Sequence, residues 1–445
     1  MLNTQKYFLV VSVRDGNPQI GANSKLLNED RIAHDWYRFV LSFPPQLVRH
    51  YSKRFGLSSG AIVLDPFCGT GTTLVECKKL GFESIGIERN PIAWFASRVK
   101  LDWQVNPDDL IRHATRVAKN AAQQLRKQGF AADSSSSAGS RLSASTLKTL
   151  RPAAASLLLA DSISPVPLHK TLVLLQNLDR ARDPRLDGHE ILALAKTLVS
   201  DVGNLRFGPE VGIGRRRRDA DVVGCWLKRI RTIAGDLQQL RQLANVRSRV
   251  YLSDARRVSG TIAEHSVDAV ITSPPYPNEK DYTRATRLES VVLGFIRSKD
   301  ELRALKQELV RSNTRNVYKQ DDDDQLIPEN SEIRAIANEI EQRRIQLGKT
   351  SGFERLYARV TRLYFGGMAR HLHDLRAVLR PGARLAYVVG DQSSYLGVMI
   401  RTGRLLADLA RSVGYTVEGI ELFRKRFATA SRELLREEVV LLRWH

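Results

Sequence analysis

The chain has 445 residues, of which 69 are basic and 48 acidic, so its formal net charge is +21. An apolar content of 42% is enough for a sizeable core and excludes wholesale disorder. The length fits two or three domains, or one domain with large insertions. The basic excess predicts a polyanionic partner, either a nucleic acid or an anionic membrane surface.

The cysteine content and the hydropathy of the chain indicate where in the cell the protein is expected. Three cysteines (Cys68, Cys77 and Cys225) are too few for a disulfide framework. No run approaches the roughly 20 apolar residues of a transmembrane helix. The N-terminal sequence MLNTQKYFLVVSVRDGN lacks the features of a signal peptide. We therefore expect a cytoplasmic protein that contacts nucleic acid and no membrane.

The first ordered pattern lies between residues 61 and 91. AIVLD (61–65) predicts a buried strand that ends in an acid, and the loop DPFCGTGTT (65–73) leads into a helix over 74–81. A second strand is expected at 84–88, and Asn90-Pro91 opens another helix. This order of strand, glycine loop, helix, strand and acid predicts half of a nucleotide-binding sheet.

The alternation then stops and later resumes. Residues 104–245 hold Leu-rich helical segments and a Ser-rich stretch near 134–140, which is expected to be a mobile loop. A strand at 250–252 and the segment VDAVITSPPY (267–276) restore the α/β pattern. Residues 300–350 are charged and helical, and their DDDD run at 321–324 is expected to be a solvated loop without metal.

The C-terminal part again predicts alternating elements. They are a helix over 355–379, a Pro-Gly turn at 381–382, a strand over 383–391, a helix over 401–413, and strands at 415–422 and 437–444. One α/β sheet with two insertions explains the chain best. The expected divisions are 1–103, 104–245, 246–299, 300–350 and 351–445, with 104–245 as a largely helical inserted domain and the main candidate for target recognition.

The glycine loop predicts a cofactor site. It lacks the third glycine of a dinucleotide fingerprint and the lysine of a P-loop, so an uncharged or zwitterionic adenosine derivative suits it better than a phosphate. Glu88, at the end of the second strand, is placed to accept hydrogen bonds from ribose hydroxyls, and Asp254 from an adenine amino group. The alternatives are that the glycines only make a tight turn and that the two carboxylates are only solvated.

The loop Thr272-Ser273-Pro274-Pro275-Tyr276 predicts a binding site for a planar amine. Two prolines stiffen it and remove two backbone donors. No His or Cys in the loop could activate Ser273 as a nucleophile. The Ser273 hydroxyl and the Pro274 carbonyl can accept the two amine hydrogens while Tyr276 stacks on the base, which frees the nitrogen lone pair for attack. A plain proline-rich turn is the alternative.

Together, the two loops resemble those of the amino-methyltransferases of DNA, which use S-adenosylmethionine. DPFCGTGTT is similar to the family's cofactor loop, GIERNP to its second motif, and TSPPY to the catalytic loop seen most often in cytosine-N4 enzymes. LSFPPQLVRHYSKRF (41–55) resembles the helix that precedes the cofactor loop, and VVGDQSS (388–394) a later part of the sheet. The resemblance covers about 41–103, 246–299 and 351–445, and neither insertion.

The resemblance implies a Rossmann-like seven-stranded methyltransferase sheet with helices on both faces, a reversed final hairpin, and a target base flipped out of duplex DNA. The implied catalytic residues are Ser273, Pro274, Pro275 and Tyr276. The implied cofactor-binding residues are Asp65, Pro66, Phe67, Gly69, Gly71, Thr72, Glu88 and Asp254. Cytosine-C5 chemistry is not expected, because none of the cysteines follows a proline.

A basic stretch predicts where DNA is contacted. Residues 206–249 hold eleven basic and four acidic residues, and the densest point is Arg215, Arg216, Arg217 and Arg218. A solvated basic loop is the alternative. The leading hypothesis is a cytosine-N4 DNA methyltransferase of a restriction-modification system, with any restriction endonuclease on a separate chain. The alternatives are an adenine-N6 DNA methyltransferase, an RNA methyltransferase and a non-catalytic DNA-binding subunit.

Overall fold

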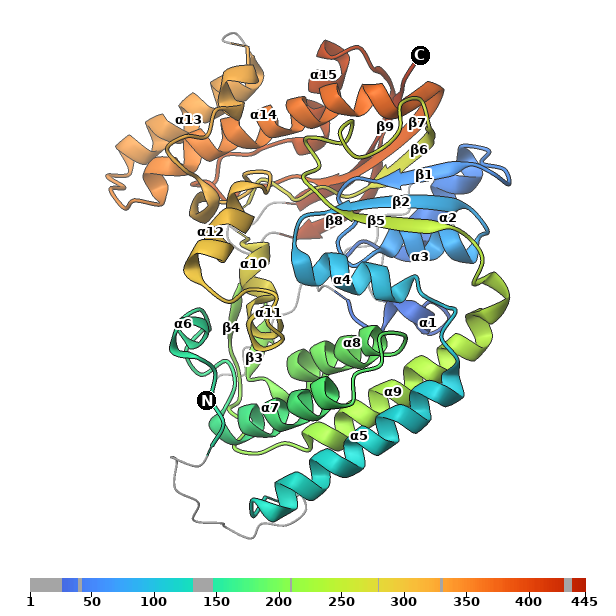
Figure 1. Ribbon diagram of the computed structural model, residues 1–445. Helices are drawn as coiled ribbons and strands as arrows, with labels where there is room; N and C mark the ends of the chain where they lie inside the picture. Colours follow the sequence, from blue (N-terminus) through green and yellow to red (C-terminus); the bar gives the residue numbers. More distant parts are fainter. Residues whose placement is uncertain are drawn as a thin grey trace.

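A seven-stranded sheet forms the centre of the molecule. The computed structural model describes residues 26–38, 42–130, 147–208, 210–278, 280–328, 331–427 and 434–445. The strand order is β5-β2-β1-β6-β7-β9-β8 (Figure 1). The strands are β1 (Ile62–Asp65), β2 (Glu83–Glu88), β5 (Ser248–Leu252), β6 (Val267–Thr272), β7 (Leu379–Gly390), β8 (Thr416–Phe427) and β9 (Leu434–Arg443).

The strand directions are those of a doubly wound sheet with one reversed strand. Pairing is parallel from β5 through β2, β1 and β6 to β7, whereas β9 is antiparallel to both of its neighbours. The predicted α/β fold class and the reversed final hairpin are therefore confirmed. Parallel pairing places the ends of β1, β2 and β6 at one edge of the sheet, where ligands of such folds bind.

Both faces of the sheet are covered by helices. Alternate strand residues point to opposite faces, so Val63 and Ile271 pack against α2 (Pro45–Arg54), whereas Leu64 and Val270 pack against α14 (Tyr357–Leu375). The other helices that belong to these layers are α3 (Thr72–Lys79), α4 (Pro91–Lys100), α13 (Glu332–Gln346) and α15 (Thr402–Ser412). The site-bearing loops are thus held by a core on each side.

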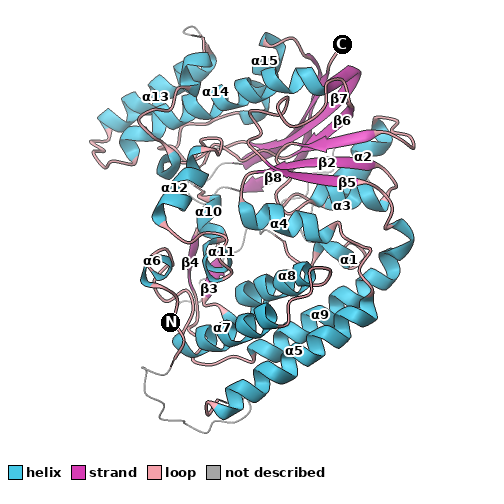
Figure 2. Ribbon diagram, in the orientation of Figure 1, coloured by secondary structure: helices cyan, strands magenta, loops and turns pink. Residues whose placement is uncertain are grey.

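The segment of the chain that runs from β2 to β5 is almost entirely helical (Figure 2). Long helices α5 (Pro107–Lys127) and α9 (Val222–Leu240) pack together with α7 (Pro165–Arg180) and α8 (Asp187–Thr197), and their core continues into α3 and α4. A small hairpin, β3 (Leu205–Phe207) and β4 (Val211–Ile213), follows α8. The Ser-rich stretch near 134–140 lies outside the described residues.

The shorter helices complete the structure around these units. They are α1 (Arg31–His34), α6 (Pro152–Ala155), α10 (Tyr282–Ala285), α11 (Arg287–Val292) and α12 (Lys299–Gln307). In the part of the chain that the structure describes, no helix is long and apolar enough to cross a membrane.

The predicted turn at 381–382 lies inside a strand. β7 begins at Leu379, and its pairing with β6 jumps from Leu379 opposite Val267 to Arg384 opposite Ala269. Gly382 lies at φ +86°, a conformation that glycine adopts at little cost. The Pro-Gly pair therefore makes an irregularity within β7 rather than the start of it.

The expectation that the DDDD run is a solvated loop is wrong for two of its residues. Asp323 is 4% exposed, and its carboxylate accepts hydrogen bonds from Arg256 (2.6 Å) and Arg370 (2.7 Å). Asp321 pairs with both ends of the Arg311 guanidinium, at 2.7 and 2.8 Å. Arginine partners from three other segments thus hold these two aspartates in a packed ion-pair network.

The close approach of this run to α14 gives a stability prediction. A Cβ at Gly366 would lie 1.8 Å from the backbone oxygen of Asp323, so one of the two segments must move. We expect Gly366→Ala to lower the free energy of unfolding by roughly 3 kcal/mol, measured by chemical denaturation. Gly235→Ala on α9 is the matched control: nothing lies within 4 Å of that position, and it should be neutral or slightly stabilising. Equal stability of the two variants would contradict the packing described here.

Candidate active site

The glycine loop joins β1 to α3 at the edge of the sheet. Gly69 (φ +52°) and Gly71 (φ +82°) both adopt left-handed conformations, and Gly71 is the N-cap of α3. Glu88, the last residue of β2, accepts the backbone N–H of Gly69 at 2.8 Å and that of Asn90 at 2.7 Å. The acid at the end of β2 therefore fixes the loop, and each of its oxygens retains a lone pair for another donor.

Asp65 links the glycine loop to the proline loop. Its Oδ1 accepts the hydroxyl of Thr272 at 2.6 Å and the backbone N–H of Phe67 at 3.1 Å. The side chain is fully buried, and burial raises its pKa to about 6. Thr272 directly precedes Ser273, so this hydrogen bond sets the positions of the two loops relative to each other.

The proline loop follows β6 and rests on β7. The Ser273 hydroxyl donates to the backbone oxygen of Val388 at 3.0 Å. Since its single proton is committed to that bond, the hydroxyl oxygen can act as an acceptor on its other side, where it also interacts with the side chain of Tyr276. The ring of Tyr276 packs against Gly390, where a Cβ would lie 2.9 Å from Cε2. Burial and the nearby charge of Glu437 raise the pKa of Tyr276, so its phenol stays neutral.

One cavity of about 580 Å³ brings the two loops together. This volume lies within the usual range of ligand pockets, roughly 300–1,000 Å³. All four predicted catalytic residues line it: Ser273, Pro274, Pro275 and Tyr276. Six of the predicted cofactor residues also line it: Pro66, Phe67, Gly69, Thr72, Glu88 and Asp254. Asp65 and Gly71 are not among the lining residues and support the loop from behind.

Comparison with known proteins agrees with this arrangement. Residues 37–93 match the DNA methylase family of N6/N4 methyltransferases. That segment contains the glycine loop and Glu88.

Similarity to individual proteins extends along most of the chain. Type II methyltransferase M.BsoBI of Geobacillus stearothermophilus is 27% identical over 94% of this chain and 85% of its own length. Type II methyltransferase M.AvaI of Nostoc sp. strain PCC 7120 is 24% identical over 88% of this chain and 81% of its own length. Among solved structures, TrmN from Thermus thermophilus aligns with 90% of this chain and 49% of its own, at 10% identity and a TM-score of 0.28.

Asp254 lies in the cavity wall but is already engaged. Both of its oxygens accept from the guanidinium of Arg256, at 2.7 to 3.1 Å, and Arg256 also donates to Asp323. An adenine amino group, which Asp254 was predicted to accept, would therefore have to share the Asp254 carboxylate with Arg256. A bidentate ion pair is invisible in the sequence pattern that singled out Asp254.

Other cavity residues were missed by sequence reasoning. Five residues from the segment 300–350 also line the cavity: Glu308, Leu309, Val310, Ser312 and Asn316. The final hairpin adds a charged cluster in which Glu437 pairs with Arg424 and, at 2.7 Å, with Arg426. The sequence predicted the two strands of the hairpin but not that their charged residues reach the cavity, and no motif marked 308–316 as part of a site.

The four consecutive arginines are not equivalent. Arg217 is half-buried, and its guanidinium donates to the backbone oxygen of Gly203. Its backbone N–H donates to the side-chain oxygen of Asn204 at 2.8 Å. Arg215, Arg216 and Arg218 are exposed, and Arg216 pairs with Asp161 at 2.5 Å. None of the four lines the cavity. A DNA contact from this cluster remains a prediction, and Arg217 is better explained as an anchor of the loop.

Proposed function

We propose that this chain is a DNA methyltransferase that transfers a methyl group from S-adenosylmethionine to the exocyclic N4 amine of a cytosine flipped out of a specific duplex sequence. The observation that carries the proposal is the single cavity shared by the glycine loop, Glu88 and the Ser-Pro-Pro-Tyr loop. The match of residues 37–93 to a DNA methylase family and the similarity to two type II methyltransferases support it.

The residues at the glycine loop fit S-adenosylmethionine. Glu88 presents a carboxylate that its two backbone donors already hold in place, as two ribose hydroxyls require. The loop 66–70 contains no charged side chain, which suits a cofactor without phosphates. The bound cofactor would supply an electrophilic methyl group. Phe67, on the cavity wall, packs edge-on against His371 with ring centroids 4.9 Å apart, which fixes that part of the loop.

The proline loop would orient the amine. Ser273 Oγ, with its own proton directed to Val388, and the Pro274 carbonyl accept the two amine hydrogens. Holding these hydrogens out of the ring plane favours a tetrahedral nitrogen and leaves its lone pair free to attack. The ring of Tyr276, held by Gly390, stacks on the flipped base and offsets part of the cost of extrusion.

A pH dependence of cofactor binding follows from Glu88. Removal of the side chain from water raises its pKa to about 7, and its ionised form accepts hydrogen bonds best. We expect the affinity for S-adenosylmethionine to rise with pH up to about 7.5, and to fall by up to about tenfold for each pH unit below the Glu88 pKa. Calorimetry at a series of pH values measures this. In Glu88→Gln this part of the slope should disappear, and an unchanged slope in that variant would contradict the assignment.

The DNA substrate and the biological role belong to the same proposal. The net charge of +21 suits contacts to the phosphate backbone. We propose residues 104–245 as the main target-recognition region, with 300–350 as a second candidate, and a role in a restriction-modification system beside a separate endonuclease. Exposed Arg215, Arg216 and Arg218 are its candidate phosphate or groove contacts.

The test is the chemical identity of the product. Duplex DNA is incubated with the protein and S-adenosylmethionine, digested to nucleosides and analysed by mass. N4-methylcytosine is the expected product. N6-methyladenine would replace the cytosine assignment with the adenine-N6 alternative, which the N6/N4 family match covers equally. Bound cofactor without any methylated nucleoside would contradict catalysis and favour a DNA-binding subunit.

A further inference from the structure

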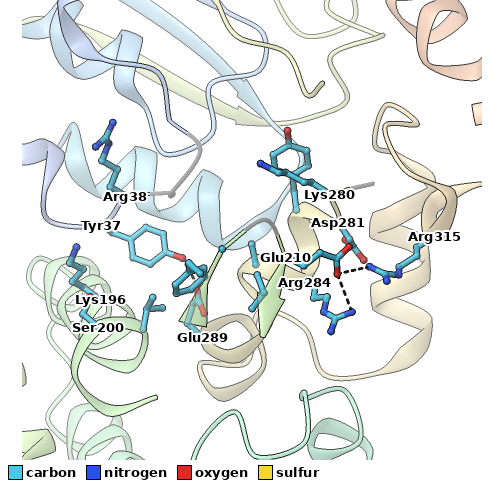
Figure 3. A pocket seen from close by; sticks show the side chains of 16 residues that line it. Tyr37, Arg38, Lys196, Ser200, Glu210, Lys280, Asp281, Arg284, Glu289 and Arg315 are labelled. Carbon is cyan, nitrogen blue, oxygen red and sulfur yellow. Dashed lines mark hydrogen bonds and ion pairs between the residues drawn. The ribbon is translucent and has the colours of Figure 1, made fainter. Parts of the chain in front are cut away.

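A second cavity of about 260 Å³ adjoins the candidate active site. Figure 3 shows the side chains that line it. The two cavities share Glu210, Lys280 and Tyr282 as lining residues, so they meet along one wall. A single water needs only roughly 10–15 Å³ by this measure, so the space is large enough for a ring-sized ligand. Its walls come from the helical insertion, from the segment after the proline loop, from the N-terminal part of the chain and from Arg315.

The buried carboxyl of Glu289 marks this cavity as a binding site. Glu289 lines the cavity, and its side chain is 1% exposed. Its Oε1 accepts the hydroxyl of Tyr37, whereas Oε2 is buried without a hydrogen-bond partner. A buried oxygen with no partner is costly, so it indicates a donor that is supplied from outside the chain. Burial raises the pKa of Glu289 to about 7.

The other lining residues suit a nucleotide. Tyr37 and Phe207 supply aromatic surface for a flat ring. Arg284 and Arg315 lie on another side, and both face the half-exposed carboxylate of Glu210, at 3.9 and 3.7 Å. These long, partly exposed ion pairs are weak. A phosphate could therefore take the place of Glu210 between the two guanidinium groups at little cost.

We propose that this cavity binds a second nucleobase of the methylated strand, one that bears an exocyclic amino group, and thereby reads one position of the recognition sequence. The proposal rests on the proposed function, since the base belongs to the bound DNA. Because the two cavities share a wall, a base close to the target in the same strand would reach the second one. The amino group would donate to Glu289 Oε2 while the adjoining phosphate pairs with Arg284 and Arg315.

The same chemistry predicts which base is rejected. Cytosine, adenine and guanine each carry an exocyclic amino group that can donate to this carboxylate. Thymine has no amino group: a carbonyl oxygen takes its place and faces the carboxylate oxygen, and the ring N–H of thymine lies one position away. A good contact of this kind discriminates by about tenfold or more. Thymine should therefore be excluded at one position of the recognised sequence.

The test compares recognised sequences. The protein and its variants are expressed in cells without other DNA methylation, and single-molecule sequencing of the DNA gives the methylated motif. Wild-type protein should reject thymine at least about tenfold at one position besides the target, and Glu289→Gln, whose amide can also donate, should accept it there. Glu190→Gln, a matched change at another buried glutamate that does not line the cavity, should keep the wild-type motif. An identical motif and stringency in Glu289→Gln would overturn the proposal.

A second variant tests the proposal if Glu289→Gln does not fold. Ala285→Phe fills the cavity from α10 without altering Glu289, and it should raise KM for DNA at least tenfold while leaving the affinity for S-adenosylmethionine unchanged. An unchanged KM would overturn the proposal. Absence of DNA methylation by the wild-type protein would instead contradict the proposed function, so the two failures are distinguishable.

Discussion

Replacement of Tyr276 by alanine is expected to lower the rate of methyl transfer roughly 10- to 100-fold and to leave the affinity for S-adenosylmethionine within about twofold of wild type. Stacking of a base on an aromatic ring contributes roughly 1–3 kcal/mol, and the ring of Tyr276 lies in the cavity wall against Gly390. Single-turnover transfer of a labelled methyl group to DNA, together with calorimetry of cofactor binding, measures the two effects separately.

Conservative variants show which part of the loop acts. Tyr276→Phe keeps the ring and should retain most of the activity. Ser273→Ala removes an acceptor of the amine and should lose activity as Tyr276→Ala does, again with cofactor binding preserved. If Tyr276→Ala weakens cofactor binding as much as methyl transfer, the loop has a structural role and does not hold the base.

Replacement of Glu88 by alanine should act the other way round and weaken the binding of S-adenosylmethionine itself. It removes the proposed ribose acceptor and leaves the N–H groups of Gly69 and Asn90 without their carboxylate. The two hydrogen bonds proposed from the ribose hydroxyls to the Glu88 carboxylate would contribute roughly 3 kcal/mol or more to binding. We therefore expect the affinity for S-adenosylmethionine to fall at least 100-fold. Calorimetry measures this directly.

A control on the same strand separates binding from folding. Glu83 begins β2 at the end away from the cavity, and Glu83→Ala should bind the cofactor as wild type does. Comparable thermal stability of the two variants, with loss of binding only in Glu88→Ala, supports the assignment. Retained affinity in a folded Glu88→Ala would contradict it.

The parts of the fold that were predictable are those in which local sequence determines the structure. The apolar run before Asp65, the glycines after it and the acid at Glu88 lie within 28 residues, and their spacing alone predicts a strand, a turn and a second strand. The stiffness of the loop at 273–276 likewise follows from its own two prolines. These local patterns also fix which end of the sheet holds the site.

The parts that were not predictable depend on distant partners. Asp254 was identified from its place after a strand, but Arg256 and Asp323 decide what its carboxylate is free to bind. The acidic run at 321–324 was expected in solvent because its arginine partners, such as Arg311 and Arg370, are visible only in three dimensions. No sequence pattern pointed to Glu289, because the feature that singles it out is a buried side-chain oxygen without a hydrogen-bond partner, which only the folded structure shows.

The most direct measurement is a crystal structure of the protein with S-adenosylhomocysteine and a duplex that contains its methylated sequence. We predict that the adenosine lies between the loop at 66–71 and Glu88, and that an extruded cytosine is stacked on Tyr276 with its amine directed at Ser273 and Pro274. A cofactor bound elsewhere, or a target base that remains stacked in the duplex away from residues 273–276, would contradict the account.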